Sequence, residues 1–220
     1  KEVAKKYGMF ITFMPKPTIG DWRSGAHINF SMTSNKDNKN IFEGKDGKFS
    51  DLAYHAVGGL IKHGTSITAV ACSTVNSYNG LVPIVGGFEG GVYTWAPTTM
   101  AYGDNNRSCM IRLPQNRFCI ENRAADMCMN PYLSLALTTA AALDGIKNKI
   151  DPGKPLNLNL YTLSPEEMEA SNIKSLPRNL LEAIEALNED DFAKEVLGDS
   201  MLLQFFSYKK DEWDRYHQAV

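Results

Sequence analysis

Several features that mark specialised classes of protein are missing from this sequence. No apolar run approaches the roughly 20 residues of a membrane-spanning helix, because the longest one, at 133–143, is interrupted by Ser134, Thr138 and Thr139. The four cysteines form no C-x-x-C pair and no signal-peptide pattern is present, so we expect reduced thiols in a cytoplasmic protein. With 23 Lys and Arg against 25 Asp and Glu, neither sign of charge dominates. This balance predicts no general attraction for nucleic acid or for an anionic membrane.

What is present is the composition of an ordinary globular chain. The 220 residues are 43% apolar and 22% charged, which excludes disordered and fibrous classes. Periodicity and turn residues predict strands at 9–14, 26–32, 93–95, 108–113 and 118–122. They predict helices at 50–64, 66–72, 131–147, 177–188, 190–197 and from 209 onward. Strands with segregated helices indicate the α+β class, and no linker divides the chain.

One predicted strand carries a polar face. His27, Asn29 and Ser31 alternate with apolar residues in 26–32, so a ring nitrogen, an amide and a hydroxyl project the same way. Such a face is either a ligand site or a solvated strand surface with one histidine, and the spacing alone favours the second.

A group of cations follows between residues 107 and 123. Arg107, Arg112, Arg117 and Arg123 lie close together in a slightly acidic chain, and Glu121 shares one strand face with Arg123. Guanidinium groups match the oxygens of a phosphate or another oxyanion. An anion site and a set of surface salt bridges are equally compatible with this spacing.

The segment 85–92 places one carboxylate among four glycines. Such a loop can close over a site and present Glu89 as a base or gate. A glycine-rich hairpin with an incidental glutamate is the alternative, and without further context it is favoured.

Read in order, these clusters resemble the C-terminal part of the glutamine synthetase catalytic domain. The resemblance runs from end to end of the chain, and so many short motifs in one order outweigh any single match. The matching motifs include Phe13-Met14-Pro15-Lys16-Pro17, His27-Ile28-Asn29-Phe30-Ser31, Val75-Asn76-Ser77-Tyr78, Asn106-Arg107-Ser108, Ile111-Arg112, Glu121-Asn122-Arg123, Asn130-Pro131-Tyr132-Leu133 and Leu143-Asp144-Gly145-Ile146.

The resemblance implies a role for each of the singled-out residues. His27 and Glu121 match ligands of the divalent metal nearest the nucleotide phosphates, Mg²⁺ or Mn²⁺. The other matches are Asn29 and Ser31 for ATP contact, Arg107 and Arg112 for the transferring phosphate, Arg123 for the glutamate substrate, and Glu89 for the flap carboxylate that takes a proton from bound ammonium.

The reaction that the resemblance implies is ligation of glutamate to ammonia with ATP as a substrate. The γ-carboxylate of glutamate attacks the γ-phosphate of ATP, and the amine then attacks the γ-glutamyl phosphate. Metals and arginines neutralise the approaching anions, and a lid excludes water. A homo-oligomeric ring is also implied for the full-length protein.

Departures from the family pattern gather on the substrate side. Where the family usually continues Lys-Arg after Asn76-Ser77-Tyr78, this chain has Asn79 and Gly80, and Trp22-Arg23-Ser24-Gly25 replaces an Asn-Gly-Ser-Gly run. Arg23 is a candidate replacement for the lost cation. Two alternatives therefore stay open: a γ-glutamyl ligase for another amine, and a catalytically silent nucleotide-binding relative.

The phosphate side also departs from the pattern. The arginine usually found two residues before the metal glutamate is replaced by Cys119, and Arg117 lies four residues before it.

The length of the chain limits what it can do alone. Residues 1–220 match only the C-terminal portion of the catalytic domain, and the N-terminal β-grasp domain and the strands with the Glu-x-Glu metal ligands have no counterpart. Glu167-Met168-Glu169 follows a Ser164-Pro165 helix cap, where residues two apart do not face one ligand. Both ends look cut from helices. We expect an incomplete domain with a mainly antiparallel sheet, inactive as an isolated fragment.

Overall fold

The fold is a small sheet with most of its helices packed on one side. A computed structural model describes residues 1–18, 20–82, 84–85 and 92–219. The strands are β1 (Ile28–Phe30), β2 (Ile84–Val85), β3 (Val92–Tyr93), β4 (Thr99–Asp104), β5 (Cys109–Leu113), β6 (Ile120–Asn122) and β7 (Lys174–Ser175). The helices are α1 (Glu2–Lys6), α2 (Asp51–Lys62), α3 (Gly64–Ala71), α4 (Val75–Gly80), α5 (Pro131–Asn148), α6 (Pro165–Ala170), α7 (Leu180–Glu189), α8 (Asp191–Leu197) and α9 (Asp199–Gln218), with 3₁₀ turns at Lys45–Gly47 and Leu160–Thr162.

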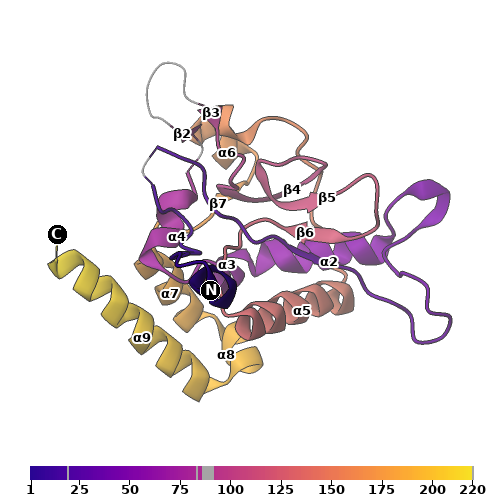
Figure 1. Ribbon diagram of the computed structural model, residues 1–220. Helices are drawn as coiled ribbons and strands as arrows, with labels where there is room; N and C mark the ends of the chain where they lie inside the picture. Colours follow the sequence, from indigo (N-terminus) through magenta and orange to yellow (C-terminus); the bar gives the residue numbers. More distant parts are fainter. Residues whose placement is uncertain (19, 83, 86–91, 220) are drawn as a thin grey trace.

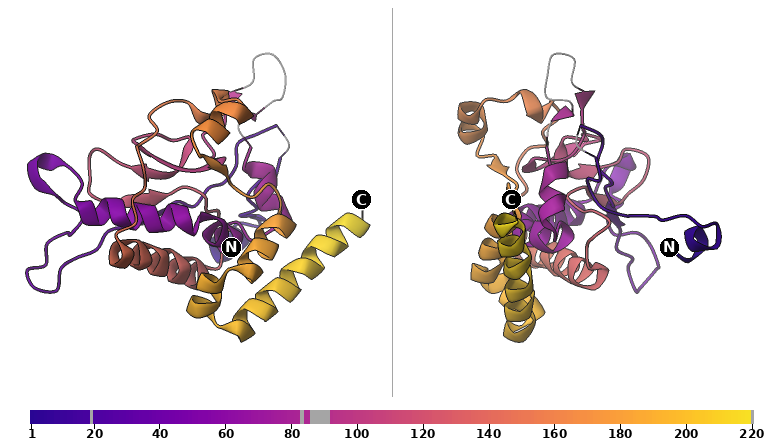
Figure 2. Two further views of the ribbon diagram at one scale, coloured as in Figure 1. Left: turned by 180° about the vertical axis from the view of Figure 1, so that it is seen from behind. Right: turned by 60° about the vertical axis from the view of Figure 1, so that its left-hand side comes forward.

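The main sheet is mostly antiparallel, as predicted. Its strand order is β1-β6-β5-β4-β7, in which the β4–β5 pair alone among these strands is parallel. Helix α2 packs against β4 and β5, α5 packs against α2, and α7 contacts α3 and α9 (Figures 1 and 2). The helices are thus segregated from the sheet, which confirms the α+β class. Within the described residues, no helix has both the length and the apolar character needed to cross a bilayer.

The contact between α2 and α5 forms the centre of the core. Ser50 caps α2 by accepting a hydrogen bond from the Ala53 amide, and the apolar face of α2 is fully buried. Gly59 is essential to this packing, since a Cβ there would lie 1.9 Å from the carbonyl oxygen of Ala141 on α5. The two backbones approach so closely that only glycine fits, and this fixes α2 beneath the sheet.

Several elements differ from the prediction. Residues 9–14 form no strand, and Gly64 begins α3 instead of closing α2. Strand β4, absent from the prediction, pairs with β5, and α9 begins at Asp199, ten residues earlier than predicted. Residues 26–32 and 118–122 shorten to the three-residue strands β1 and β6.

Candidate functional site

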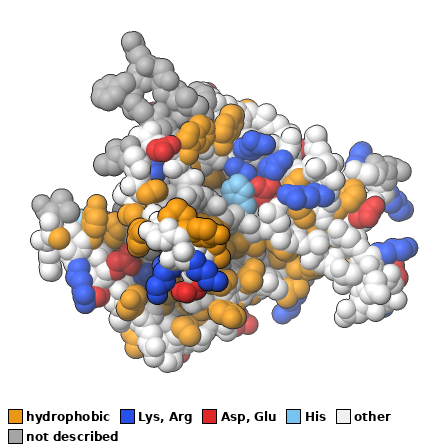
Figure 3. Space-filling model, in the orientation of Figure 1, with side chains coloured by type: hydrophobic (Ala, Val, Ile, Leu, Met, Phe, Trp, Pro, Cys, Tyr) orange, Lys and Arg blue, Asp and Glu red, His pale blue; other side chains and the backbone are white. Residues whose placement is uncertain are grey.

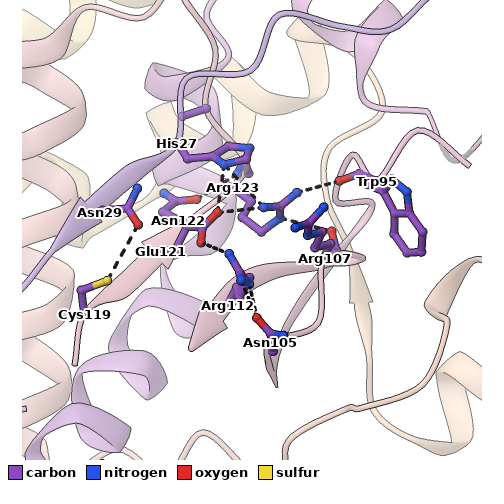
Figure 4. Close-up of polar contacts among 12 residues, drawn as sticks. His27, Asn29, Trp95, Asn105, Arg107, Arg112, Cys119, Glu121, Asn122 and Arg123 are labelled. Carbon is purple, nitrogen blue, oxygen red and sulfur yellow. Dashed lines mark hydrogen bonds and ion pairs between the residues drawn. The ribbon is translucent and has the colours of Figure 1, made fainter. Parts of the chain in front are cut away.

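Three neighbouring strands bring the predicted site residues onto one face. In the register of β1 and β6, Asn29 lies across from Glu121, and in the register of β6 and β5, Arg112 lies across from the same Glu121. Because strand side chains alternate, His27 and Arg123, two residues along from Asn29 and Glu121, project to the same side. Figure 4 shows these side chains converging from the three strands. Residues nearly one hundred positions apart in the sequence therefore form one cluster.

Glu121 is the centre of the cluster. Its side chain is 3% exposed, and both of its oxygens face cations or a ring nitrogen. Oε1 lies 2.9 Å from Nδ1 of His27 and accepts a 2.8 Å hydrogen bond from Nη1 of Arg123. Oε2 accepts a 2.7 Å hydrogen bond from Nη1 of Arg112. Contacts of this length to guanidinium groups are strong charge-assisted hydrogen bonds.

These contacts determine the ionisation of Glu121. Burial by itself raises the pKa of the carboxyl, but the hydrogen bond to His27 and the charges of Arg123 and Arg112 outweigh burial and lower the pKa to about 2. Glu121 is therefore an anion at neutral pH, available to a cation as a hard oxygen donor.

Arg123 is held in place on all sides. Its side chain is 6% exposed. Besides its bond to Glu121, Nε donates to the carbonyl of Arg107 at 3.2 Å and Nη2 donates to the carbonyl of Trp95 at 3.0 Å. The guanidinium plane is thus fixed before any ligand arrives, which lowers the entropy lost on binding.

The rim of the cluster is polar and open. Arg112 also donates through Nε and Nη2 to Oδ1 of Asn105, and Nη2 of Arg117 donates to Oδ1 of Asn29 at 3.0 Å. An open hollow of about 670 Å³ adjoins the cluster, lined by Trp95, Asn105 and Arg107 among others. Figure 3 shows a histidine surrounded by basic side chains on the face toward the viewer.

The structure brings together six of the eight predicted site residues: His27, Asn29, Arg107, Arg112, Glu121 and Arg123. Ser31 lies exposed, one residue beyond β1. Glu89 falls outside the described residues.

The sequence assigned no role to two partners in the site. Asn105 has a left-handed φ of 60°, a conformation that asparagine tolerates. An asparagine close to Arg107 was therefore a sequence signal for a turn at this position. Trp95 takes part through its backbone carbonyl, which accepts the hydrogen bond from Arg123, so the type of its side chain could not indicate this contact.

The donors on this face fit part of a divalent cation site. An imidazole nitrogen and a carboxylate oxygen are donor types that suit Mg²⁺ or Mn²⁺, and His27 Nδ1 and Glu121 Oε1 lie together on this face, 2.9 Å apart. Among the described residues, however, no group of three or more His, Cys, Asp and Glu side chains is placed to hold a metal. His27 and Glu121 therefore offer a two-donor half-site that needs further donors from elsewhere.

Comparisons with known proteins agree with this geometry. The family model for the glutamine synthetase catalytic domain matches residues 1–220. A glutamine synthetase of Methanosarcina mazei is 43% identical over 100% of this chain and 48% of its own length. A glutamate–methylamine ligase of Methyloversatilis universalis is 42% identical over 100% of this chain and 49% of its own length.

A solved structure agrees as well. The "GmaS/ADP complex-Conformation 1" is 38% identical with a TM-score of 0.87, and the match covers 100% of this chain and 49% of that one. The chain thus spans about half the length of the curated relatives it matches. With the whole of residues 1–220 matched by the family model, the chain belongs to the glutamine synthetase family.

Proposed function

We propose that the full-length protein is an ATP-dependent γ-glutamyl ligase that joins glutamate to ammonia. The observation that carries this proposal is the buried, ionised Glu121 between Arg112, Arg123 and His27. One carboxylate does not neutralise the arginines around it, so the cluster has a net positive charge suited to a phosphate group and a substrate carboxylate.

Each side chain has a task in this reaction. His27 and Glu121 would hold Mg²⁺ or Mn²⁺, which when bound screens the charge of the ATP phosphates. Arg107 and Arg112 grip the phosphate that moves from ATP to the γ-carboxylate of glutamate. Arg123, fixed by three partners, orients the carboxylate of glutamate. Asn29 and Ser31 contact the nucleotide, and Glu89 removes the proton from ammonium before it attacks the γ-glutamyl phosphate.

A second candidate is ligation of a different amine, such as methylamine. The observation that favours it is the 42% identity to a glutamate–methylamine ligase, which differs by one percentage point from the 43% identity to the Methanosarcina mazei glutamine synthetase. The altered substrate side at Asn79, Gly80 and Arg23 is consistent with a changed acceptor. We extend the proposal to a homo-oligomeric ring, which sedimentation of the full-length protein would measure.

Phosphate release from ATP tests the proposal directly. The full-length protein is incubated with ATP, Mg²⁺ and glutamate, together with ammonium, methylamine or a larger primary amine, and the amide product is identified by mass spectrometry. We expect one amine to stimulate phosphate release and to appear in a γ-glutamyl amide. If no amine stimulates release above the rate without amine, the ligase proposal fails and the silent nucleotide-binding relative stands.

A further inference from the structure

Arg117 lies next to the face of β1 that carries Asn29, although it is not part of a strand. Its Nη2 donates a 3.0 Å hydrogen bond to Oδ1 of Asn29, which lies directly across from Glu121. The thiol of Cys119 lies 3.8 Å from the same oxygen (Figure 4). Positions 117 and 119 thus reach the same amide group.

The local backbone explains how Arg117 reaches this place. The Cys119 amide donates to the carbonyl of Arg117 at 3.1 Å, which folds residues 117–119 into a tight turn. Phe118 anchors the turn from the other side, because its carbonyl accepts a 2.7 Å hydrogen bond from Asn40 and its ring packs edge-on against Phe49. With Phe118 held in this way, the side chains of Arg117 and Cys119 both reach the face that carries Glu121.

The contact with Arg117 orients the amide of Asn29. The guanidinium of Arg117 and the thiol of Cys119 both donate to Oδ1, so the amide nitrogen points away from these two donors. Figure 4 shows the oxygen of Asn29 turned toward Cys119. Among the described residues no hydrogen-bond acceptor takes up this nitrogen. Asn29 therefore presents an N–H donor toward the open face, where an anionic or carbonyl oxygen of a ligand is its complement.

We propose that Arg117 is a positioning residue for the nucleotide: through Asn29 it presents an amide donor to the phosphate-bearing ligand, and its own charge adds a fourth guanidinium to Arg107, Arg112 and Arg123. In this interpretation Arg117 brings a guanidinium to Asn29 from the turn, while Cys119, just before β6, adds only a thiol contact at 3.8 Å. The inference rests on the proposed function, because it requires ATP as the ligand.

A purely structural reading makes a different prediction. An exposed arginine with one hydrogen bond typically contributes little to stability and nothing to ligand binding. Under that reading, removal of Arg117 leaves nucleotide affinity unchanged, so a binding measurement separates the two readings.

The experiment measures ATP binding to the full-length protein by calorimetry with Mg²⁺ present and with glutamate and amine absent. We expect Arg117→Ala to weaken ATP binding roughly tenfold, the loss of one charge-assisted hydrogen bond and a nearby charge. In steady-state assays the KM for ATP should rise by a similar factor, while the KM for glutamate and the kcat at saturating ATP stay within about twofold. The matched control is Arg215→Ala, which removes the same charge from α9, where Arg215 pairs with Asp211.

A relocation variant makes the test specific. In the double variant Arg117→Ala with Cys119→Arg, a guanidinium returns to Asn29 from the neighbouring position, and we expect most of the ATP affinity to recover. As a second single variant, Asn29→Asp removes the amide donor and adds a negative charge opposite the phosphates, so it should weaken ATP binding at least as much.

The outcomes are distinguishable. If the wild-type protein binds no ATP, the proposed function itself fails. If the wild type binds ATP and Arg117→Ala or Asn29→Asp binds it equally well, only the role of Arg117 is refuted. An equal rise in the KM for glutamate and for ATP, or no recovery in the double variant, also overturns the inference.

Discussion

At the scale of single residues, the side chain of Arg23 occupies the space that a side chain at position 80 would need. A Cβ on Gly80 would lie 2.9 Å from Cβ and 3.3 Å from Cδ of Arg23, so a larger residue at 80 and the present path of Arg23 exclude one another. Nη2 of Arg23 donates to the Ala125 carbonyl at 2.6 Å, the same carbonyl that accepts from the Ala26 amide. The two departures on the substrate side are thus one packing exchange, and the hydrogen bond from Arg23 holds the segment before His27 against Ala125, which follows β6.

Glu121 and Glu167 allow a paired test of which carboxylates matter for turnover. In the full-length protein, Glu121→Gln should lower kcat at least about a thousandfold, because a neutral amide is a poor cation ligand and leaves Arg112 and Arg123 without their anion. Glu167→Ala should leave kcat unchanged, since Glu167 accepts a 2.8 Å hydrogen bond from the Ser164 amide in the capping box of α6. That loss should cost only about 0.5–1 kcal/mol of unfolding free energy.

Steady-state rates at saturating ATP check the predicted kcat of each variant, and a thermal melt of each variant checks its predicted stability. Equal losses of kcat in the two variants, or full activity of Glu121→Gln, would contradict the assignment of Glu121 as a metal ligand.

At the scale of elements, helices were more predictable than strands. The range 131–147 became α5 (Pro131–Asn148) because the cap at Asn130 and the proline after it are local signals. Strand β4 has the sequence Thr-Met-Ala-Tyr-Gly-Asp, with little β-branched content, and is stabilised by pairing with β5 and β7 rather than by its own residues. Residues 9–14 show the reverse case: strong strand propensity without a strand, and with Phe10 93% exposed.

In the candidate site, too, local features could be predicted and long-range contacts could not. Residue identities and order indicated His27, Arg112, Glu121 and Arg123, whereas the contacts between them depend on the register of β1, β6 and β5. Register is a long-range property, so the bond from Arg117 to Asn29, 88 positions apart, had no local signal.

An ion cluster between α2 and α5 gives a pH prediction at the element scale. Oδ2 of Asp144 lies 2.9 Å from Nε2 of His63, whose ring stacks on Phe192, and 3.1 Å from Nζ of Lys62. The hydrogen bond to His63 has the largest effect on the pKa of Asp144. Together with the hydrogen bond and charge of Lys62 it outweighs burial and lowers the pKa of this carboxyl. His63, at the C-terminal end of α2, is 7% exposed and joins α2 to α5 through this contact.

The sign of the effect follows from the lowered pKa. A carboxyl with a folded pKa below its unfolded value of about 3.9 stabilises the fold above that value, and the stabilisation is lost as the pH falls through the lowered folded pKa. We expect Asp144→Asn to cost about 1 kcal/mol or less near neutral pH, and this cost to disappear in acid.

Urea unfolding of the wild type and of Asp144→Asn between neutral and acid pH measures the difference in their unfolding free energies. Asp211→Asn, which breaks an exposed pair with Arg215 on α9, is the control and should show little effect at any pH. A cost of Asp144→Asn that is constant across the range would contradict the ion-pair account.

At the scale of the whole molecule, the candidate cation site has too few donors and one apolar surface segment has no cover. The described residues offer two donors to a cation, His27 and Glu121, and β1, which follows His27, lies at an edge of the sheet. The segment after α1 is apolar and uncovered, with Tyr7 75%, Met9 60% and Phe10 93% exposed. Exposed apolar patches of this kind usually pack against another surface. Since the chain spans about half of its relatives, we expect the missing metal donors and the missing cover to come from the rest of the full-length protein.

Metal titration tests this expectation without measuring turnover. Mn²⁺ binding, followed by electron paramagnetic resonance of the free ion, should be weak in the 220-residue chain, with a dissociation constant of roughly 1 mM, because two protein donors leave most of the octahedron to water. In the full-length protein the same titration should give binding at least about a hundredfold tighter, since added carboxylates each contribute charge and remove water. His27→Ala should abolish the weak binding of the short chain, and circular dichroism should show that the variant stays folded. Micromolar binding by the 220-residue chain, or weak binding that survives His27→Ala, would show that the cation is held elsewhere and that the half-site at Glu121 has a different purpose.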